Sequence, residues 1–330
     1  MTPRGTDWSL AGLVAVLGLS GALTLFGGAW VFVAHDVAGF ALGGVLVWKL
    51  RRVWRRIGTR RAGLIALAFV AGTLLTGVAW SSAIRPTAFG YNPLNLHSVL
   101  GAVLVLAVLT HAVQRAKRPR RGDLTRRQVI AGAGVGAGAF ALLQLQRTPG
   151  LAAARRRFTG SYEVASFEGN AFPSTSWVAD APKPLDDTDY TLAFGERRLT
   201  ALELDAGDEL TATLDCTGGF YSTQRWRGTR LDRLLGDAPG SHVRVISHTG
   251  YRWSFDRHDA RELLLATHVG DELLSHGHGA PVRLVAPGRR GFIWVKWVTR
   301  VELHDGPDPG ALPSTLWSSF TPQGRGSAAG

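Results

Sequence analysis

The sequence predicts a multi-domain chain, in which an N-terminal α-helical transmembrane bundle of four helices plus a fifth connecting helix precedes a mixed α+β domain. Two observations lead to this fold class. Residues 8–113 consist mainly of Leu, Val, Ala, Gly and Phe, whereas residues 155–330 have the mixed, charged composition of a folded soluble domain. A length of 330 residues also leaves room for two domains.

Four apolar segments make up the expected bundle, at residues 10–26, 29–50, 62–84 and 94–113. A helix needs about 17 to 25 apolar residues to cross the hydrocarbon core, and each segment meets this length. Lipid offers the backbone no hydrogen-bond partners, so such segments must satisfy their own peptide groups, as helices do.

The loops between these segments differ in charge, which predicts their orientation. Residues 51–61 contain six arginines and residues 114–127 contain seven Lys and Arg, but residues 85–93 contain only Arg85. The positive-inside rule places the two basic loops and the N-terminus in the cytoplasm. We therefore expect a multi-pass protein in the plasma membrane of a bacterium, with an extracytoplasmic C-terminal domain.

The formal net charge of +12 has the same origin. The basic loops explain much of this surplus, and no RNA-binding or helix-turn-helix motif accompanies it, so we do not expect a nucleic-acid partner. A single cysteine, Cys216, excludes an intramolecular disulfide and calls for a chemical explanation of its own.

A fifth apolar segment, residues 128–145, follows the motif Thr125-Arg126-Arg127-Gln128-Val129-Ile130. This motif resembles a twin-arginine export signal, which would suit a domain that acquires its cofactor before export. The alternative is an ordinary basic flank before a helix. An internal signal is expected to stay as an anchor, although three arginines at residues 155–157 then fall on the outer side.

Three histidines lie within the apolar segments, where polar residues are costly and usually functional. His35 and His97 lie near the outer ends of two different segments, so their matching depth predicts that they hold one b-type haem. His111 lies near the cytoplasmic end and is a further candidate haem ligand, which another protomer would have to complete. The alternative is that all three are interfacial histidines bonded to backbone or lipid headgroups. In architecture and histidine placement the bundle resembles small four-helix b-type cytochrome domains.

The C-terminal domain shows short runs of β-type residues separated by turn residues. Two helical pieces are expected at residues 231–235 and 258–265. The expected strands cover residues 198–204, 209–215, 241–248, 281–286 and 292–303. This pattern predicts a mixed α and β domain with antiparallel character.

Several ordered motifs in this domain carry a family resemblance. They are Leu214-Asp215-Cys216-Thr217-Gly218-Gly219, Trp226-Arg227-Gly228-Thr229-Arg230-Leu231, Ser247-His248-Thr249-Gly250-Tyr251, and the stretches 278–288 and 291–297. Over about residues 160–305 the chain resembles the molybdenum-binding domain of the sulfite oxidase family.

The resemblance implies a Mo-molybdopterin cofactor, with the Cys216 thiolate as the protein ligand of molybdenum. Thiolate is a soft ligand suited to such a metal. The remaining implied contacts to the cofactor come from several loops: Asn170, Pro173, Ser174, Ser247 (or Thr249), His278, Arg283, Trp294, Val295 and Lys296. Arg283 and Lys296 suit a phosphate better than the alternatives of a strand-edge and a solvated charge.

The substrate is less constrained than the cofactor. Sulfite oxidases of animals and plants carry an arginine five residues after the cysteine, where this chain has Tyr221, the second candidate catalytic residue beside Cys216. An aromatic residue at the entrance to the site resembles the arrangement in the bacterial periplasmic methionine sulfoxide reductase branch of the family. Four arginines near these motifs would nevertheless restore a positive pocket for an anion: Arg225, Arg227, Arg289 and Arg290.

The sequence thus predicts four parts. Residues 1–114 form the helical haem domain, 115–157 the basic loop and fifth helix, 158–305 the molybdopterin domain and 306–330 a flexible tail. The expected function is oxygen-atom transfer to or from a small-molecule substrate, with electrons relayed through the haem to or from the quinone pool, and S-oxide or N-oxide reduction is favoured. The alternatives are a sulfite-oxidising dehydrogenase and a non-catalytic, membrane-tethered binding domain.

Overall fold

A computed structural model describes residues 2–57, 61–87, 91–115, 125–175, 180, 182–185 and 190–318 of the chain. The chain divides into two compact units, Met1–Tyr162 and Glu163–Gly330. The division falls five residues after the predicted start of the second domain at residue 158, because residues 158–162 pack with the helices.

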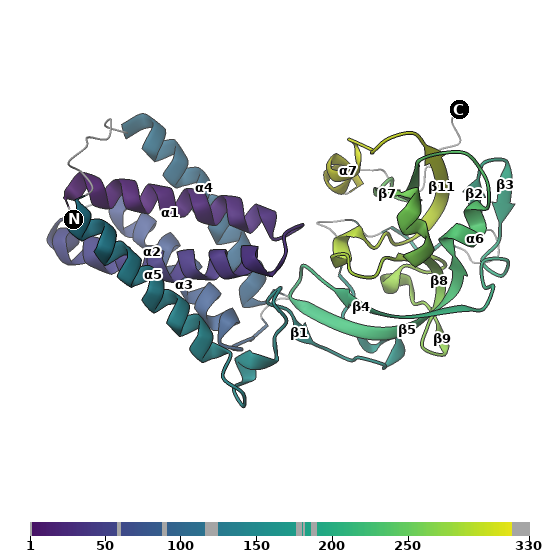
Figure 1. Cartoon of the computed structure of the whole chain (residues 1–330), viewed down its shortest axis with the longest axis horizontal. Helices are drawn as coiled ribbons and strands as arrows, with labels where there is room; N and C mark the ends of the chain where they lie inside the picture. The colour runs from purple at the N-terminus through teal and green to yellow at the C-terminus, as the bar shows by residue number, and fades with distance from the viewer. Residues whose placement is uncertain are drawn as a thin grey trace. The chain divides into compact units, whose positions relative to one another are not determined.

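The first unit contains five long helices that lie side by side (Figure 1). All five predicted apolar segments are helical. Helix α1 contacts α2 and α4, α3 contacts α4, and α5 contacts α2. The helices are α1 (Pro3–Leu23), α2 (Ala29–Ile57), α3 (Arg61–Ser81), α4 (Pro93–Arg115) and α5 (Arg126–Gln146).

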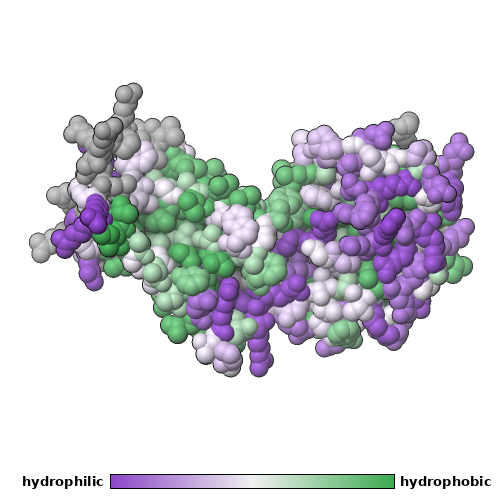
Figure 2. Space-filling view, in the orientation of Figure 1, coloured by the Kyte–Doolittle hydropathy of each residue, from purple (hydrophilic) through white to green (hydrophobic). Residues whose placement is uncertain are grey.

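The surface of these helices is apolar. Leu19, Leu75 and Leu106 have exposed fractions of 64%, 69% and 68%, although large apolar side chains on a soluble protein are usually buried. Figure 2 shows hydrophobic side chains covering the helices and mostly hydrophilic ones covering the second unit. Helices α1, α2, α4 and α5 are long and apolar enough to cross a membrane, and in α3 the described apolar stretch, Leu67–Ser81, is shorter.

An ion pair and two hydrogen bonds join the segment after α5 to α2 and to the end of α3. Arg156 forms an ion pair with Asp36 of α2, with 3.4 Å between Nη2 and Oδ2. The Trp80 indole donates to the Gly160 carbonyl, and the Tyr162 hydroxyl donates to the Trp80 carbonyl, both at 2.9 Å. An arginine at this end of the bundle therefore has a carboxylate partner, which accounts for one of the three arginines that the orientation model left unexplained.

The second unit is built on two β-sheets. In the first, β5 lies between β1 and β8, β8 also pairs with β10, and β4 and β9 extend the sheet. In the second, the order is β3-β2-β11-β6-β7. The strands are β1 (Tyr162–Glu163), β2 (Leu192–Phe194), β3 (Arg197–Leu199), β4 (Asp208–Asp215), β5 (Phe220–Arg230), β6 (His242–Ser247), β7 (Arg252–Asp256), β8 (Leu264–Val269), β9 (Glu272–Leu273), β10 (Arg283–Val285) and β11 (Val298–His304).

Antiparallel pairing dominates, as predicted, and β2 with β11 is a parallel exception. The core of the second unit consists of side chains from both sheets, and Trp226, Leu265 and Leu284 are fully buried in it. Alternating burial along β5 puts Trp226 on the core side and Arg225 on the solvent side, which is the two-residue period of a strand.

The expected elements differ from the structure at several places. The strand predicted over 198–204 ends at Leu199 and is followed by a turn at residues 201–204, and strands β2, β5 and β7 were not predicted. The strand predicted over 292–303 begins only at Val298, because Gly291–Ile293 forms a 3₁₀ turn and Trp297 has a φ of +51°. The helix predicted over 258–265 is a 3₁₀ helix, Arg257–Glu262, and the chain then enters β8. The apolar residues at the end of the predicted helix, Leu264 and Leu265, belong to β8, where they pair with β5 and β10.

The tail predicted to be flexible from residue 306 is ordered through residue 318. Helix α7 (Ala311–Trp317) packs on β7, and its Ser314 hydroxyl accepts a hydrogen bond from the Arg252 amide at 3.1 Å. Asp308 forms ion pairs with Arg244 at 2.8 Å and with Arg252 at 2.7 Å. These long-range contacts, invisible in a Pro- and Gly-rich sequence, fix the segment.

The core makes a first test possible. We expect Leu284→Ala to lower the free energy of unfolding of the second unit by about 2–5 kcal/mol, because it removes a fully buried side chain from between the sheets. The same substitution at Leu202, whose side chain is 84% exposed, is the matched control and should change it little. Thermal unfolding of the purified full chain measures both, and equal melting temperatures for the two variants would contradict this packing.

Candidate functional site

Cys216 lies in the tight turn between β4 and β5. Its amide donates to the Phe220 carbonyl at 2.8 Å, and Gly219, with φ of +92°, donates back to the Cys216 carbonyl at 3.2 Å. The thiol is buried, and its Sγ lies 3.3 Å from the Gly218 amide and 3.2 Å from Oγ1 of Thr175. Both neighbours can donate a hydrogen bond to sulfur, as a thiolate requires.

A second loop closes over the backbone of this turn. Arg290 forms an ion pair with Asp215, the residue before the cysteine, with 2.6 Å between Nη1 and Oδ1. At Gly291 a Cβ atom would lie 3.1 Å from Cα of Cys216 and 3.2 Å from the Asp215 carbonyl oxygen. Only glycine lets the two loops approach this closely.

Arg283, on β10, is the most deeply buried cation near the thiol, with 1% of its surface exposed. Its Nη1 donates to the His278 carbonyl at 2.9 Å, and its guanidinium carbon lies 5.1 Å and 5.6 Å from the ring centroids of Trp226 and Trp294. Among the described residues it has no carboxylate partner, and its Nε has no hydrogen-bond partner. Burial lowers the pKa of Arg283 to about 9, and the nearby Cys216 partly offsets the shift.

Lys296 supplies a second cation near the Cys216 thiol. Its Nζ donates to the carbonyls of Thr175 at 2.7 Å and Gly277 at 2.5 Å, and Thr175 is also the residue that touches the thiol. Burial, and then repulsion by Arg283, lowers the pKa of Lys296 to about 7. A buried cation and a half-buried one beside a thiol, without an ion-pair carboxylate in the described part of the chain, fit a bound anion.

His278 is buried between the two cations, Arg283 and Lys296, and the loop that contains Phe172. Its Nε2 donates to the Phe172 carbonyl at 2.8 Å, and its Nδ1 accepts from the Ser275 hydroxyl at 2.7 Å. Burial lowers the pKa of His278 to about 4. The residue is therefore neutral at pH 7, and both ring nitrogens are already used by the protein.

Gly279 allows the cations to approach His278. It has a φ of +108°, and a Cβ there would lie 3.0 Å from Cβ of Arg283 and 3.1 Å from Cβ of Lys296. A side chain at this position would be strained and would push both cations away.

The loop at residues 170–174 lies next to this cluster. The Asn170 amide donates to the Leu273 carbonyl at 2.9 Å and accepts from the Ser275 amide at 2.9 Å, so it fixes the segment that leads to His278. The Ser174 hydroxyl donates to the Gly277 carbonyl at 2.5 Å. Pro173, between them, is exposed.

The hydroxyl contact predicted at Ser247 or Thr249 is a hydrogen-bonded pair of both residues rather than a single residue. Ser247 and Thr249 lie 3.2 Å apart through their hydroxyl oxygens, and Thr249 donates to Oδ2 of Asp180 at 3.1 Å. Burial raises the pKa of Asp180 above its ordinary value. The unresolved choice between Ser247 and Thr249 in the sequence thus has a structural basis, because both belong to one buried network.

The last three predicted cofactor contacts differ among themselves. Trp294 and Val295 are core residues: the Trp294 indole donates to the Arg289 carbonyl at 3.2 Å, and the Val295 carbonyl accepts from Leu284 at 2.7 Å. Only Lys296 presents a charged group at the cluster. The register of β4 and β5 pairs Tyr221 with Asp215, which puts Tyr221 beside the Cys216 turn.

The sequence did not indicate Thr175, Asp180, Ser275 or the Asp215–Arg290 pair. Thr175 follows the predicted Ser174, so adjacency was the only clue to it. Asp180 and Ser275 reach the cluster through the fold, and nothing in their local sequence distinguishes them from surface residues.

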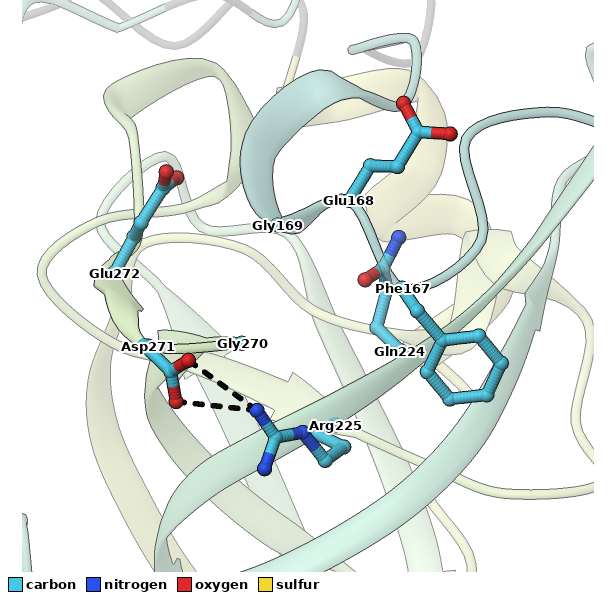
Figure 3. A pocket seen from close by; sticks show the side chains of 8 residues that line it. All are labelled: Phe167, Glu168, Gly169, Gln224, Arg225, Gly270, Asp271 and Glu272. Carbon is cyan, nitrogen blue, oxygen red and sulfur yellow. Dashed lines mark hydrogen bonds and ion pairs between the residues drawn. The ribbon is translucent and has the colours of Figure 1, made fainter.

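A separate small pocket lies beside the middle of β5. It has a volume of about 220 Å³, and its lining includes Glu168, Gln224 and the ion pair of Arg225 with Asp271, at 3.1 Å (Figure 3). None of the predicted cofactor contacts lines it, and Arg225 is the one candidate anion-pocket arginine among its lining residues. We therefore place the candidate site at Cys216 and not in this pocket.

In the helical unit the structure brings two of the three predicted histidines together. The ring centroids of His35 and His97 lie 6.1 Å apart, with their planes at 84°. The side chain of His111 lies outside the described part of the chain.

Comparison with known proteins identifies the second unit. Residues 189–312 match the family described as "Oxidoreductase molybdopterin binding domain". The second unit is a sulfite-oxidase-type molybdopterin-binding domain. The mixed α and β character and the molybdopterin-binding family predicted for this domain are confirmed.

Individual relatives agree with this assignment. Human mitochondrial sulfite oxidase is 31% identical over 131 residues, which cover 29% of this chain and 24% of the human protein. The catalytic subunit of protein-methionine-sulfoxide reductase from Gluconobacter oxydans is 26% identical over 244 residues, 63% of this chain and 77% of that protein. The chain spans only about a quarter of the human enzyme it matches.

A solved structure, the sulfane dehydrogenase SoxCD from Paracoccus pantotrophus, is 26% identical over 38% of this chain and 41% of its own, with a TM-score of 0.35.

The burial of Lys296 gives a pH prediction for the cofactor-free chain. Below pH 7 the amine is charged in both the folded and the unfolded chain, so folding bears the full cost of burying it. Between pH 7 and 10.5 only the unfolded chain keeps the proton, so stability rises with pH over this window. We expect Lys296→Met to raise the melting temperature at pH 6 and to lose that advantage near pH 10.

Lys183→Met is the matched control, since Lys183 is an exposed lysine of the same unit. It should leave the pH profile of the melting temperature unchanged. A Lys296→Met profile parallel to the wild type at all pH values would contradict a desolvated amine without an ion-pair partner.

Proposed function

We propose that this chain is a membrane-bound molybdenum-cofactor oxidoreductase that transfers an oxygen atom on the extracytoplasmic side of a bacterial plasma membrane. Electrons pass between the quinone pool and the site through a b-type haem, and the favoured reaction is reduction of an S-oxide or N-oxide. One observation carries the proposal: the buried Cys216 thiol lies beside two cations, the buried Arg283 and the half-buried Lys296, that form no ion pair with a described carboxylate.

The residues present fit Mo-molybdopterin. Cys216 would bind the molybdenum as thiolate, and the Gly218 amide and the Thr175 hydroxyl would stabilise its negative charge. Arg283 and Lys296 would bind the anionic end of the pterin, and this contact would raise their lowered pKa values toward the ordinary range. When bound, the cofactor supplies the two-electron oxygen-atom transfer.

The charge balance around the site favours a neutral oxide over sulfite. Four arginines near the motifs were candidates for an anion pocket, but each is paired with a carboxylate. The N···O distances are 3.1 Å for Arg225–Asp271, 3.2 Å for Arg227–Asp205, 2.6 Å for Arg289–Asp259 and 2.6 Å for Arg290–Asp215. A neutral sulfoxide needs no additional cation. The similarity to a methionine sulfoxide reductase over 77% of that protein supports the same choice.

The helical unit supports the electron-transfer part of the proposal. An iron bound to an imidazole nitrogen on each side, at about 2 Å per bond, holds the two ring centroids roughly 6 Å apart. His35 and His97 have a centroid separation of 6.1 Å. The apolar surface of the helices supports a location in the lipid bilayer, where a quinol would have access to the haem.

Turnover assays test the reaction. With a reduced dye as electron donor, we expect the purified enzyme to reduce methionine sulfoxide, and with an oxidised dye as acceptor we expect little oxidation of sulfite. Cys216→Ser should lose molybdenum, measured by elemental analysis, together with at least about a thousandfold of the activity, because the metal loses its thiolate. Rapid sulfite oxidation without sulfoxide reduction would select the dehydrogenase, and a wild-type chain without molybdenum would sink the enzyme proposal.

A spectrum tests the haem. The reduced-minus-oxidised difference spectrum should contain b-type bands that disappear in His35→Ala and in His97→Ala, since each variant removes one axial ligand. His258→Ala changes an exposed histidine of the second unit and should leave the bands intact. Bands that survive both ligand substitutions would show that the haem, if any, is held elsewhere.

A further inference from the structure

Each of the two histidines of the helical unit contacts a neighbouring helix through a hydrogen bond and through a glycine beside its ring. His35 of α2 meets Ser20 and Gly21 of α1, and His97 of α4 meets Thr73 and Gly77 of α3. We infer that Ser20, the Thr73 carbonyl and Gly77 are positioning groups, which fix both imidazoles as iron ligands through Nε2 with their ring planes crossed. This inference rests on the haem of the proposed function.

The hydrogen bond of His97 determines its tautomer. Nδ1 of His97 lies 2.9 Å from the Thr73 carbonyl oxygen. A carbonyl can only accept, so Nδ1 must carry the hydrogen in the neutral ring. The lone pair is therefore on Nε2, which is the nitrogen left to bind a metal.

The same holds for His35 through a short relay. Nδ1 of His35 lies 2.9 Å from Oγ of Ser20, and that hydroxyl lies 3.3 Å from the Leu17 carbonyl oxygen. Because the carbonyl takes the hydroxyl hydrogen, Ser20 accepts from Nδ1, and Nε2 again keeps the lone pair. Such outer hydrogen bonds are the usual means by which proteins orient metal-bound histidines.

Glycines provide the space for the rings. A Cβ at Gly77 would lie 2.9 Å from Cε1 and 3.0 Å from Nδ1 of His97, so any side chain there would displace the ring. The corresponding approach of Gly21 to Cε1 of His35 is 3.5 Å, an ordinary contact. The ring of His97 is thus the more tightly held of the two, and Gly77 is the residue that permits its position.

The angle of 84° between the rings follows from these contacts, because each ring is fixed to a different helix. Two axial imidazoles with crossed planes give ferric low-spin haem a strongly anisotropic EPR signal, whereas parallel planes give a rhombic one. The Ser20 contact also has a redox consequence. Donation from Nδ1 makes the ring a better electron donor and stabilises ferric iron, so loss of the Ser20 acceptor should raise the reduction potential.

The test uses the full-length protein, purified in detergent, with EPR of the oxidised form and a redox titration followed by the b-type bands. We expect Ser20→Ala to keep the bands, to shift the EPR signal away from the strongly anisotropic type and to raise the midpoint potential. Ser20→Thr keeps the hydroxyl and should restore the wild-type values. Ser9→Ala, whose hydroxyl donates to the Gly5 carbonyl of its own helix, is the matched control and should change neither readout.

A glycine pair tests the second contact. Gly77→Ala should lose the bands or change their EPR type, because its methyl group would occupy the space of the His97 ring. Gly101→Ala adds the same methyl group where the nearest atom, Cγ2 of Thr73, is 3.9 Å away, and it should retain wild-type spectra.

The outcomes separate this inference from the proposed function. A wild-type protein without b-type bands would overturn the haem itself and this inference with it. Bands with a rhombic EPR signal in the wild type, or an unchanged signal and potential in Ser20→Ala, would overturn the positioning role and leave the haem proposal standing.

Discussion

The burial of Arg283 imposes the main constraint on the second unit. A guanidinium with 1% of its surface exposed normally has a carboxylate partner, but here the described neighbours are the His278 carbonyl and the faces of two tryptophans. The cost of such an arrangement falls when an anion binds. The two-sheet core therefore does more than give stability, because it holds a positive charge ready beside a thiol.

The loops around the site serve the same constraint. Asn170 fixes the segment before His278, and Gly279 lets Arg283 and Lys296 approach each other from either side of it. Like charges at this distance repel, which is one reason why the pKa of Lys296 falls to about 7. The other arginines near the site, by contrast, are each paired with a carboxylate. This contrast is what distinguishes a binding site from an ordinary basic surface.

The helical unit also contains polar side chains, on otherwise apolar helices, that are paired within the unit. Its interior histidines are costly unless their nitrogens are satisfied, and Ser20 and the Thr73 carbonyl each satisfy one. The remaining nitrogen of each ring is the one that a metal would take. In the N-terminal part of α2, Asp36 forms an ion pair with Arg156, so a second costly group is also paired within the same unit.

The sequence by itself determined the helices, the domain order and the family of the second unit. Long apolar runs admit hardly any other structure, and the motif around Cys216 is specific enough to indicate its family. It also named Cys216, His278, Arg283 and Lys296, which the fold brings together, and matched His35 with His97 by depth. Only the tertiary structure revealed Thr175 at the thiol, the carboxylates that neutralise Arg225, Arg227, Arg289 and Arg290, and the order of the segment after residue 306. Those contacts join residues far apart in the chain, and a pairing between distant residues depends on the packing of the sheets and helices between them rather than on any local pattern.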